Sequence, residues 1–178
     1  ERVFRLGFVA VEARIVGDLG FHAAGDPIAV RVLRSDLAGT PRAGGGAWRL
    51  LRLEQPAEAL TPAEQPMPEP PGGPDPYATP GDRLRPRWEE TYDPEAVLAL
   101  WAAGEEIASG AATHGDDGAA ALSLPALGAG AYRLVYTTAD DFGAEFETSE
   151  HLVVAGDRRT QLALLGVYGL ELPLGCLA

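Results

Sequence analysis

The sequence has few cysteines, few basic residues and no long apolar run, and each of these absences limits what the protein can be. One cysteine among 178 residues excludes an internal disulfide, so packing must hold the fold together. Fourteen basic against 26 acidic side chains give a net charge of −12, which argues against a surface that binds nucleic acid phosphates. No apolar run reaches the roughly 18 residues that a membrane-spanning helix needs. We therefore expect neither nucleic acid binding nor direct membrane insertion.

The start of the chain also lacks a targeting signal. It reads ERVFRLGF, without a basic start followed by a long apolar run, so it shows no export signal of its own. It opens directly in strand-like sequence and without an initiator Met. We expect the chain to be part of a longer protein.

Motifs that mark common catalytic sites are missing as well. The sequence contains no GxSxG, no GxxxxGKS/T and no strand-linked GxGxxG, and the glycines at 44–46 form a plain run before Trp48. We therefore expect a protein that is not an enzyme. We assign it no catalytic, cofactor-binding or metal-binding residue, and no cofactor.

The clearest structural signal that is present lies between Leu124 and Val154. Within 131–138, large apolar side chains recur at every second position, which is typical of a half-buried strand: Tyr132, Leu134 and Tyr136. A second alternating run follows the break at 139–143. Gly143 suits the end of a hairpin loop, where a positive φ is often needed. The stretch therefore predicts an antiparallel β-hairpin.

Five further segments read as strands, because apolar residues alternate or cluster between turn residues: 8–16, 28–33, 47–55, 105–113 and 119–124. With the hairpin they make about seven short strands. Helices do not alternate with them, which disfavours a parallel α/β sheet. The pattern predicts an all-β protein, an antiparallel immunoglobulin-like β-sandwich.

The segment 56–92 differs in character, because prolines recur from Pro56 to Pro86 and exclude a regular ladder or helix. We expect an extended, polyproline-like insertion or, alternatively, a mobile one. A short helix should follow over 93–103, with Asp93 as N-cap, Pro94 at the first helical position and Gly104 closing the end. Its apolar face should lie on the sandwich: Val97, Leu98 and Trp101.

Several polar residues are candidate ligands, but their spacing does not favour a site. Two acidic pairs in predicted turns could bind calcium, but adjacent aspartates in short turns more often serve turn formation and solubility: Asp116, Asp117, Asp140 and Asp141. Three histidines lack the spacing of a zinc site and read as surface or turn residues: His22, His114 and His151. Cys176 could be a nucleophile, but it has no local acid–base partner, and we expect a buried or terminal thiol.

Aromatic residues offer one binding hypothesis. An aromatic platform for sugar rings could be built from Trp48, Trp88, Trp101, Tyr77 and Tyr92. The preferred interpretation is that Trp48 and Trp101 belong to the core. The other three would then fix the Pro-rich insertion to the sandwich.

Three stretches resemble a macroglobulin-like domain of bacterial α2-macroglobulin family proteins. LPALGAGAYRLVYTTADDFGAEFETSEHLVV resembles its last strands, ASGAATHGDDGAAALSLPAL the element before them, and GDPIAVRVLRSDLAGTPRAGGGAWRLLRLEQP an earlier strand pair. The resemblance covers most of the chain, from about Val9 to Val154. The thioester motif of the family, Cys-Gly-Glu-Gln, is absent, since Cys176 is followed by Leu177 and Ala178.

The resemblance implies a non-catalytic structural and interaction module of a large bacterial protease inhibitor in the periplasm or at the cell surface. Its partners would be neighbouring domains of the same parent chain and, through the whole protein, proteases. Residues 1–156 would form the macroglobulin-like sandwich, and 157–178 a C-terminal strand or the start of the next module. The alternative is a stand-alone β-sandwich binding module of carbohydrate-binding or adhesin type.

Overall fold

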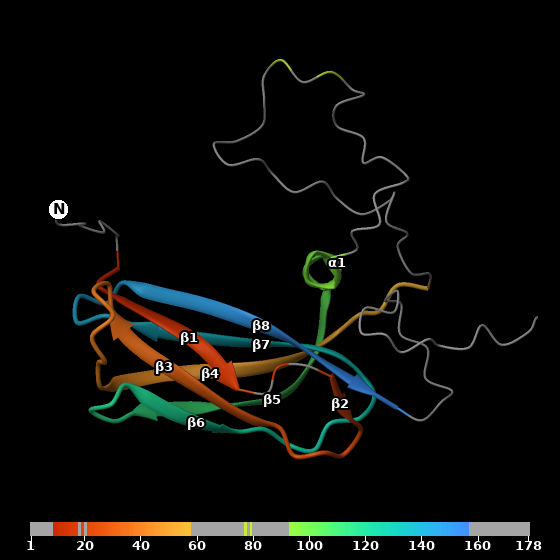
Figure 1. The fold of residues 1–178 in the computed structure, drawn as a ribbon, viewed down its shortest axis with the longest axis horizontal. Coiled ribbons are helices and arrows are strands. Elements are labelled where there is room, and N and C mark those ends of the chain that lie inside the picture. The colour runs from red at the N-terminus through yellow and green to blue at the C-terminus, as the bar shows by residue number, and fades with distance from the viewer. Residues whose placement is uncertain are drawn as a thin grey trace, which may run out of the picture. The chain divides into compact units, whose positions relative to one another are not determined.

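The computed structural model describes residues 9–17, 19, 21–57, 77, 79 and 93–156 (Figure 1). These residues form eight β-strands and one short α-helix, which confirms the prediction of a mostly β protein. In chain order the elements are β1 (Val11–Gly17), β2 (Phe21–Ala23), β3 (Ala29–Asp36), β4 (Gly44–Leu53), α1 (Pro94–Leu100), β5 (Ala103–His114), β6 (Ala119–Ser123), β7 (Gly130–Ala139) and β8 (Glu145–Ala155).

The chain divides into two compact units. The first comprises Glu1–Glu54 with Ala102–Thr160, and it contains the eight strands named above. The second comprises Gln55–Trp101 with Gln161–Ala178, and it contains α1.

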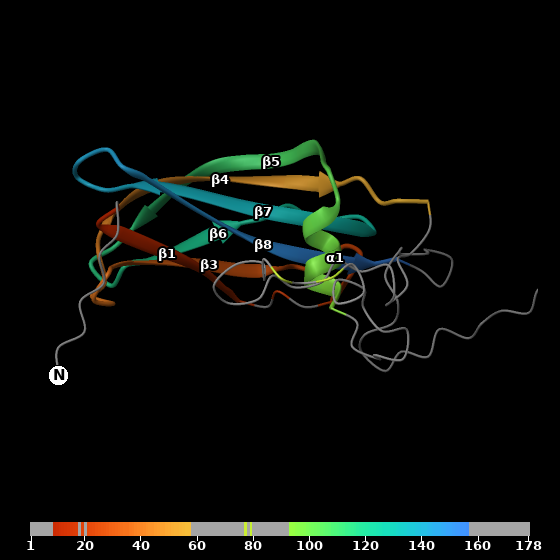
Figure 2. The ribbon, with the colours of Figure 1, turned by 90° about the horizontal axis from the view of Figure 1, so that it is seen from above.

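The strands form two sheets. One has the order β1-β3-β6 and the other the order β2-β8-β7-β4-β5. Seen from above (Figure 2), β4, β5 and β7 lie in one layer and β1, β3 and β6 in the other. The larger sheet is curled, and β2 pairs with β8 in parallel. The prediction of a wholly antiparallel sandwich of about seven strands is corrected here, because β2 is only three residues long and too short for alternation to reveal it.

One apolar core lies between the two sheets. The inward faces predicted from alternation are confirmed, because these side chains are buried: Val11, Ala13 and Ile15 on β1, Val30 and Val32 on β3, Trp48 and Leu50 on β4, and Tyr132, Leu134 and Tyr136 on β7. Burying one large aliphatic side chain contributes roughly 1.5–3 kcal/mol. β7 was predicted to be half-buried, but it is buried on both faces around its middle, since Val135 on the opposite face is only 6% exposed.

The predicted hairpin is β7 and β8, and it is confirmed. The two strands pair without a break from Gly130↔Val154 to Ala139↔Glu145. The loop between them closes through a hydrogen bond from Gly143 N to Asp140 O of 3.0 Å. Gly143 has φ +82°, the conformation for which glycine was expected there.

Helix α1 starts as predicted and ends earlier. The Asp93 side chain accepts hydrogen bonds from the backbone N–H groups of Glu95 (3.0 Å) and Ala96 (3.3 Å), and Pro94 is the first helical residue. The predicted end at Gly104 is wrong. The helix stops at Leu100, because the following residues join the sheet: Glu54 N bonds to Ala102 O, and Ala103 pairs with Leu53. No helix within the described ranges is long and apolar enough to cross a membrane.

Most of the Pro-rich insertion and the whole segment 157–178 lie outside the described residues. The predicted extended or mobile insertion and the predicted C-terminal strand therefore stay predictions.

Gly46 on β4 supplies a specific test of the packing. A Cβ at this position would overlap the Tyr136 hydroxyl and lie 2.7 Å from Thr137 O, whereas a Cβ at Gly45 would meet nothing closer than Ala112 O at 4.0 Å. We predict that Gly46→Ala lowers the free energy of unfolding by about 1–3 kcal/mol, the usual effect of overpacking. Gly45→Ala is the matched control. Urea denaturation measures both variants, and equal stability of the two would contradict this account of the close approach.

Candidate functional site

The most organised set of polar side chains in the first unit is buried between the sheets. We call it the polar network, and its members are Arg34, Thr138, Tyr136 and His114. All four side chains are almost fully buried. Because a buried polar group without a partner is costly, the partners of each member decide whether the network is free to do chemistry.

Arg34 joins three segments of the chain. Its Nε donates to Thr138 Oγ1 at 3.1 Å, its Nη1 donates to the main-chain oxygen of Ala43, and its Nη2 donates to that of Ala139 at 2.9 Å. The guanidinium thus connects β3 with the loop before β4 and with the end of β7. Its partners in these bonds are neutral oxygens.

His114 and Tyr136 form the other half of the network. His114 Nδ1 lies 2.7 Å from Gly118 O, and its Nε2 lies 2.6 Å from the Tyr136 hydroxyl. A carbonyl can only accept, so Nδ1 carries the proton, and in the neutral ring Nε2 accepts from the Tyr136 O–H. Burial raises the pKa of the Tyr136 phenol above its usual value, although the Thr138 hydrogen bond and the Arg34 charge act in the opposite direction.

Thr138 joins the Arg34 half of the network to β4. Its hydroxyl accepts from Arg34 and donates to Gly45 O at 2.8 Å. Every member therefore bonds to another member or to the main chain. This arrangement fixes strand ends, and Arg34 also contributes to the lining of a hollow along β1 and β3.

The Asp140 carboxylate at the β7–β8 loop is also hydrogen-bonded to the main chain. Its Oδ1 accepts from Phe142 N and Ala144 N, both at 2.9 Å, and its Oδ2 accepts from Ala10 N at 2.9 Å. These main-chain donors hold the pKa of the Asp140 carboxyl below its ordinary value, and those of Ala10 and Ala144 have the largest effects. The carboxylate thereby fixes both the loop and the stretch that leads into β1.

The two acidic pairs that are candidate calcium ligands, Asp116–Asp117 and Asp140–Asp141, lie in separate turns. Asp117 Oδ1 accepts from Ala119 N in the β5–β6 turn, while Asp140 closes the β7–β8 loop. Asp116 and Asp141 are exposed. Among the described residues, no three His, Cys, Asp or Glu side chains are grouped so that they could hold a metal ion.

The three histidines lie on three different strands. The expectation of surface or turn positions is wrong for His22 and His114, which are 7% and 3% exposed. His114 ends β5 instead of belonging to the turn. His151 on β8 accepts a hydrogen bond from Arg133 Nε on β7 at 3.1 Å.

The aromatic platform is not assembled from the residues that the structure describes. Trp48 and Trp101 are 6% and 5% exposed, in agreement with the preferred interpretation that they are buried, while Tyr77 is 88% exposed. Trp88, Tyr92 and Cys176 lie outside the described residues.

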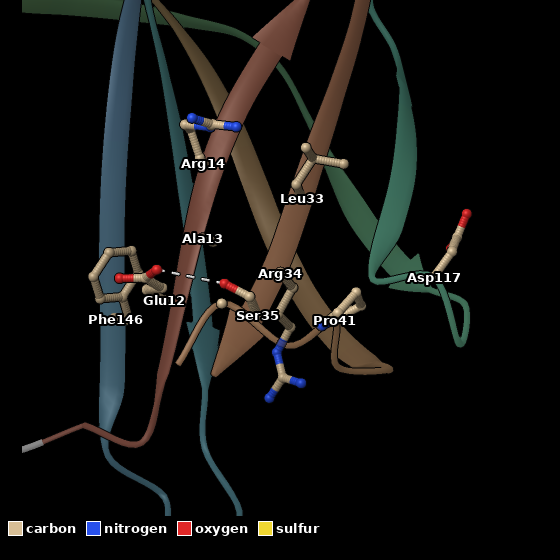
Figure 3. A pocket seen from close by; sticks show the side chains of 10 residues that line it. Glu12, Ala13, Arg14, Leu33, Arg34, Ser35, Pro41, Asp117 and Phe146 are labelled. Carbon is tan, nitrogen blue, oxygen red and sulfur yellow. Dashed lines mark hydrogen bonds between the residues drawn. The ribbon is translucent and has the colours of Figure 1, made fainter. Parts of the chain in front are cut away.

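A half-open hollow of about 510 Å³ lies along β1 and β3 (Figure 3). Its lining mixes apolar groups such as Leu33, Pro41 and Phe146 with the charged Glu12 and Arg14. The dashed line in Figure 3 is the long bond from Ser35 Oγ to Glu12 Oε1, at 3.5 Å. Arg34, Ser35 and Asp117 belong to the same lining, so the hollow carries charges of both signs.

Sequence reasoning missed the polar network, although one signal could have located part of it. Arg34 follows Ile28, Val30 and Val32 at the same parity, so alternation already directs its side chain into the core. The partners Thr138 and Ala139 are more than a hundred residues away, and no local pattern connects them.

Comparisons with known proteins do not assign this site. No protein-family model matches the chain, and no curated protein matches it.

Tyr136→Phe tests the network. We predict a loss of about 1–3 kcal/mol in the free energy of unfolding, because His114 Nε2 keeps its burial and loses its donor. Tyr77→Phe is the control, since that phenol is 88% exposed. Urea denaturation at pH 7 measures both, and an equal effect of the two substitutions would contradict the assigned hydrogen bond.

Asp140 makes the stability of the fold sensitive to acid. Because its pKa is lower in the folded than in the unfolded chain, its contribution is present above the ordinary value of 3.8 and is lost as pH falls through the folded pKa. We predict that Asp140→Asn lowers the melting temperature at pH 7 and flattens its decline below about pH 4. Asp141→Asn, at an exposed neighbour, should leave the melting curves unchanged. Thermal melts between about pH 2 and pH 7 compare the three proteins. If the melting temperature of Asp140→Asn fell with acid as steeply as that of the natural protein, the prediction would be contradicted.

Proposed function

We propose that the chain is a non-catalytic, immunoglobulin-like module of a large bacterial α2-macroglobulin-like protease inhibitor that is exported to the periplasm or cell surface. The module would serve as a structural and interaction part of that protein. The observation that carries the proposal is the order of the strands, which supports the sequence resemblance independently of any motif.

The distribution of the strands between the two sheets supports an immunoglobulin-like arrangement. When the three-residue β2 is set aside, the first, second and fifth of the remaining strands form one sheet, β1-β3-β6. The third, sixth and seventh lie side by side in the other, as β4, β7 and β8. Immunoglobulin-like sandwiches distribute their strands between the two sheets in this way.

Two side chains add to this support. Tyr132 near the start of β7 donates its hydroxyl hydrogen to Gly128 O at 2.8 Å. A tyrosine that bonds a few residues upstream at this corner is a hallmark of the fold, as is a buried tryptophan on the third strand, here Trp48 on β4.

Three features depart from the immunoglobulin type, so the fold is immunoglobulin-like and not a regular immunoglobulin domain. The fourth strand, β5, pairs with the third, while in constant-type domains it joins the fifth. The β2–β8 pair is parallel and the larger sheet is curled. A single cysteine excludes the disulfide that antibody domains place between their sheets.

The non-catalytic part of the proposal is supported by how the buried polar groups are used. Arg34, His114 and Asp140 are the kinds of side chain that catalysis employs, yet each bonds to the main chain of this fold. An interaction module needs such fixed strand ends, because a rigid loop loses less conformational entropy on binding.

A trapping assay tests the proposal. The natural full-length protein is incubated with an endopeptidase, and the remaining activity is measured on a short chromogenic peptide and on a large protein substrate. We predict that peptide cleavage persists while cleavage of the large substrate falls, because an enclosed protease admits only small substrates. Deleting residues 9–156 should abolish this difference.

The control is full-length protein with Gly45→Ala, which should trap as the natural protein does. Equal inhibition on both substrates, no inhibition, or trapping that survives the deletion would each contradict the proposal. Retention of an insoluble polysaccharide without trapping would favour the stand-alone binding module instead.

A further inference from the structure

The hollow along β1 and β3 contains two opposite charges that the fold itself leaves with little or no pairing. Part of its lining is made by two pairs of directly opposite residues, Glu12↔Ser35 and Arg14↔Leu33. The residue between them on each strand is buried, so these four side chains point to the outer face of the sheet. Figure 3 shows the two pairs one above the other, with Ser35 bonded to Glu12. All four residues belong to the first compact unit.

Glu12 is a carboxylate with little hydrogen bonding for its degree of burial. It is half-buried, and within the described ranges its one hydrogen bond comes from Ser35 Oγ at 3.5 Å. Good O–H···O bonds are about 2.7–2.8 Å long, so this bond is weak. A charged N–H donor makes a shorter and stronger bond to a carboxylate. Glu12 therefore favours an ammonium group in a ligand.

Arg14 supplies the opposite charge. It is exposed, and it forms no hydrogen bond or ion pair with the residues that the structure describes. The ion pair at this end of β3 joins Arg42 Nη2 to Asp36 Oδ2 at 3.0 Å and does not involve it. Residues two apart on a strand are separated by roughly 6.6 Å, so a small molecule can bridge Glu12 and Arg14. A guanidinium holds a carboxylate through two parallel N–H donors.

The charges of the hollow decide between three kinds of ligand. An anion meets a chain of net charge −12 and the carboxylates of Glu12 and Asp117 in the same lining. A cation satisfies those carboxylates but is repelled by Arg14. A zwitterion satisfies both signs at once, and the net charge does not oppose it. The hollow therefore favours a neutral molecule that carries one positive and one negative group.

The apolar part of the lining sets the remaining character of the ligand. Leu33, Pro41 and Phe146 lie beside the charged residues, and Leu33 and Phe146 are half-buried. The volume of about 510 Å³ is within the range of roughly 300–1,000 Å³ that is usual for small-ligand sites. A compact zwitterion with an apolar side chain matches this lining.

We propose that the hollow is a binding site for a free α-amino acid with a large apolar side chain, such as phenylalanine or leucine. Arg14 binds the α-carboxylate, Glu12 binds the α-ammonium group, and the ligand side chain packs on Leu33 and Pro41. The inference goes beyond the proposed inhibitor role and does not rest on it.

Equilibrium dialysis of the natural full-length protein with radiolabelled L-phenylalanine tests the site. A half-open hollow and a ligand of this size predict weak, saturable binding, with a dissociation constant of about 1 mM. Competition with unlabelled derivatives tests each charge of the ligand. N-acetyl-L-phenylalanine lacks the ammonium group and L-phenylalaninamide lacks the carboxylate, and we expect each to bind several-fold more weakly than L-phenylalanine.

Two substitutions connect each charge of the ligand to one side chain. Arg14→Gln should weaken L-phenylalanine binding several-fold and leave L-phenylalaninamide unchanged, because the amide has no carboxylate for Arg14. Glu12→Gln should weaken L-phenylalanine binding and leave N-acetyl-L-phenylalanine unchanged. The matched controls are Arg31→Gln and Glu105→Gln, exposed residues on β3 and β5. Both should bind as the natural protein does, and urea denaturation verifies that all four variants are folded.

Several results would overturn the inference. They are the absence of saturable binding, equal binding of the three ligands, which would mean apolar contact alone, and equal effects of the hollow substitutions and their controls. The trapping assay is separate from this test. Trapping without amino acid binding would refute this site alone, and amino acid binding without trapping would refute the inhibitor role alone.

Discussion

The buried guanidinium of Arg34 is the interaction on which the strand-bearing unit depends. It bonds to neutral oxygens on three segments, so it fixes the end of β3, the loop before β4 and the end of β7 against one another. A buried charge must be well hydrogen-bonded to be tolerated, and here the main chain supplies much of that compensation. The glycine at Gly44 leaves room for the guanidinium, because a Cβ there would approach Arg34 Nη1 to 2.8 Å.

This use of polar groups also bears on function. The four side chains of the polar network and the carboxylate of Asp140 form their hydrogen bonds at strand ends and loops. Exposed features of the described residues include the half-open hollow along β1 and β3 and the acidic hairpin tip with Phe142.

Much of the fold could be predicted from the sequence, because its strands alternate strongly. The inward residues of β1, β3 and β7 follow from a period of two, and the hairpin loop follows from Gly143. The failures have local causes. β2 has three residues and gains its ladder only from β8, and α1 ends at Leu100 because the next residues pair with β4. Alternation places Arg34 on the inward face, but its partners in the polar network could not be predicted, since the hydrogen bond to Thr138 spans 104 positions.

By itself the sequence determined that this protein is built from strands and which faces of those strands are apolar. It also determined that no internal disulfide joins the strands and that the chain is strongly acidic. These properties depend on residue types and their local spacing. The tertiary structure alone decided which strands are neighbours, that one pair is parallel, that two histidines are buried and that Asp140 fixes both a hairpin loop and the stretch leading into β1. These properties depend on hydrogen bonds and packing between residues far apart in the chain, and such partners are chosen only when the whole sheet forms.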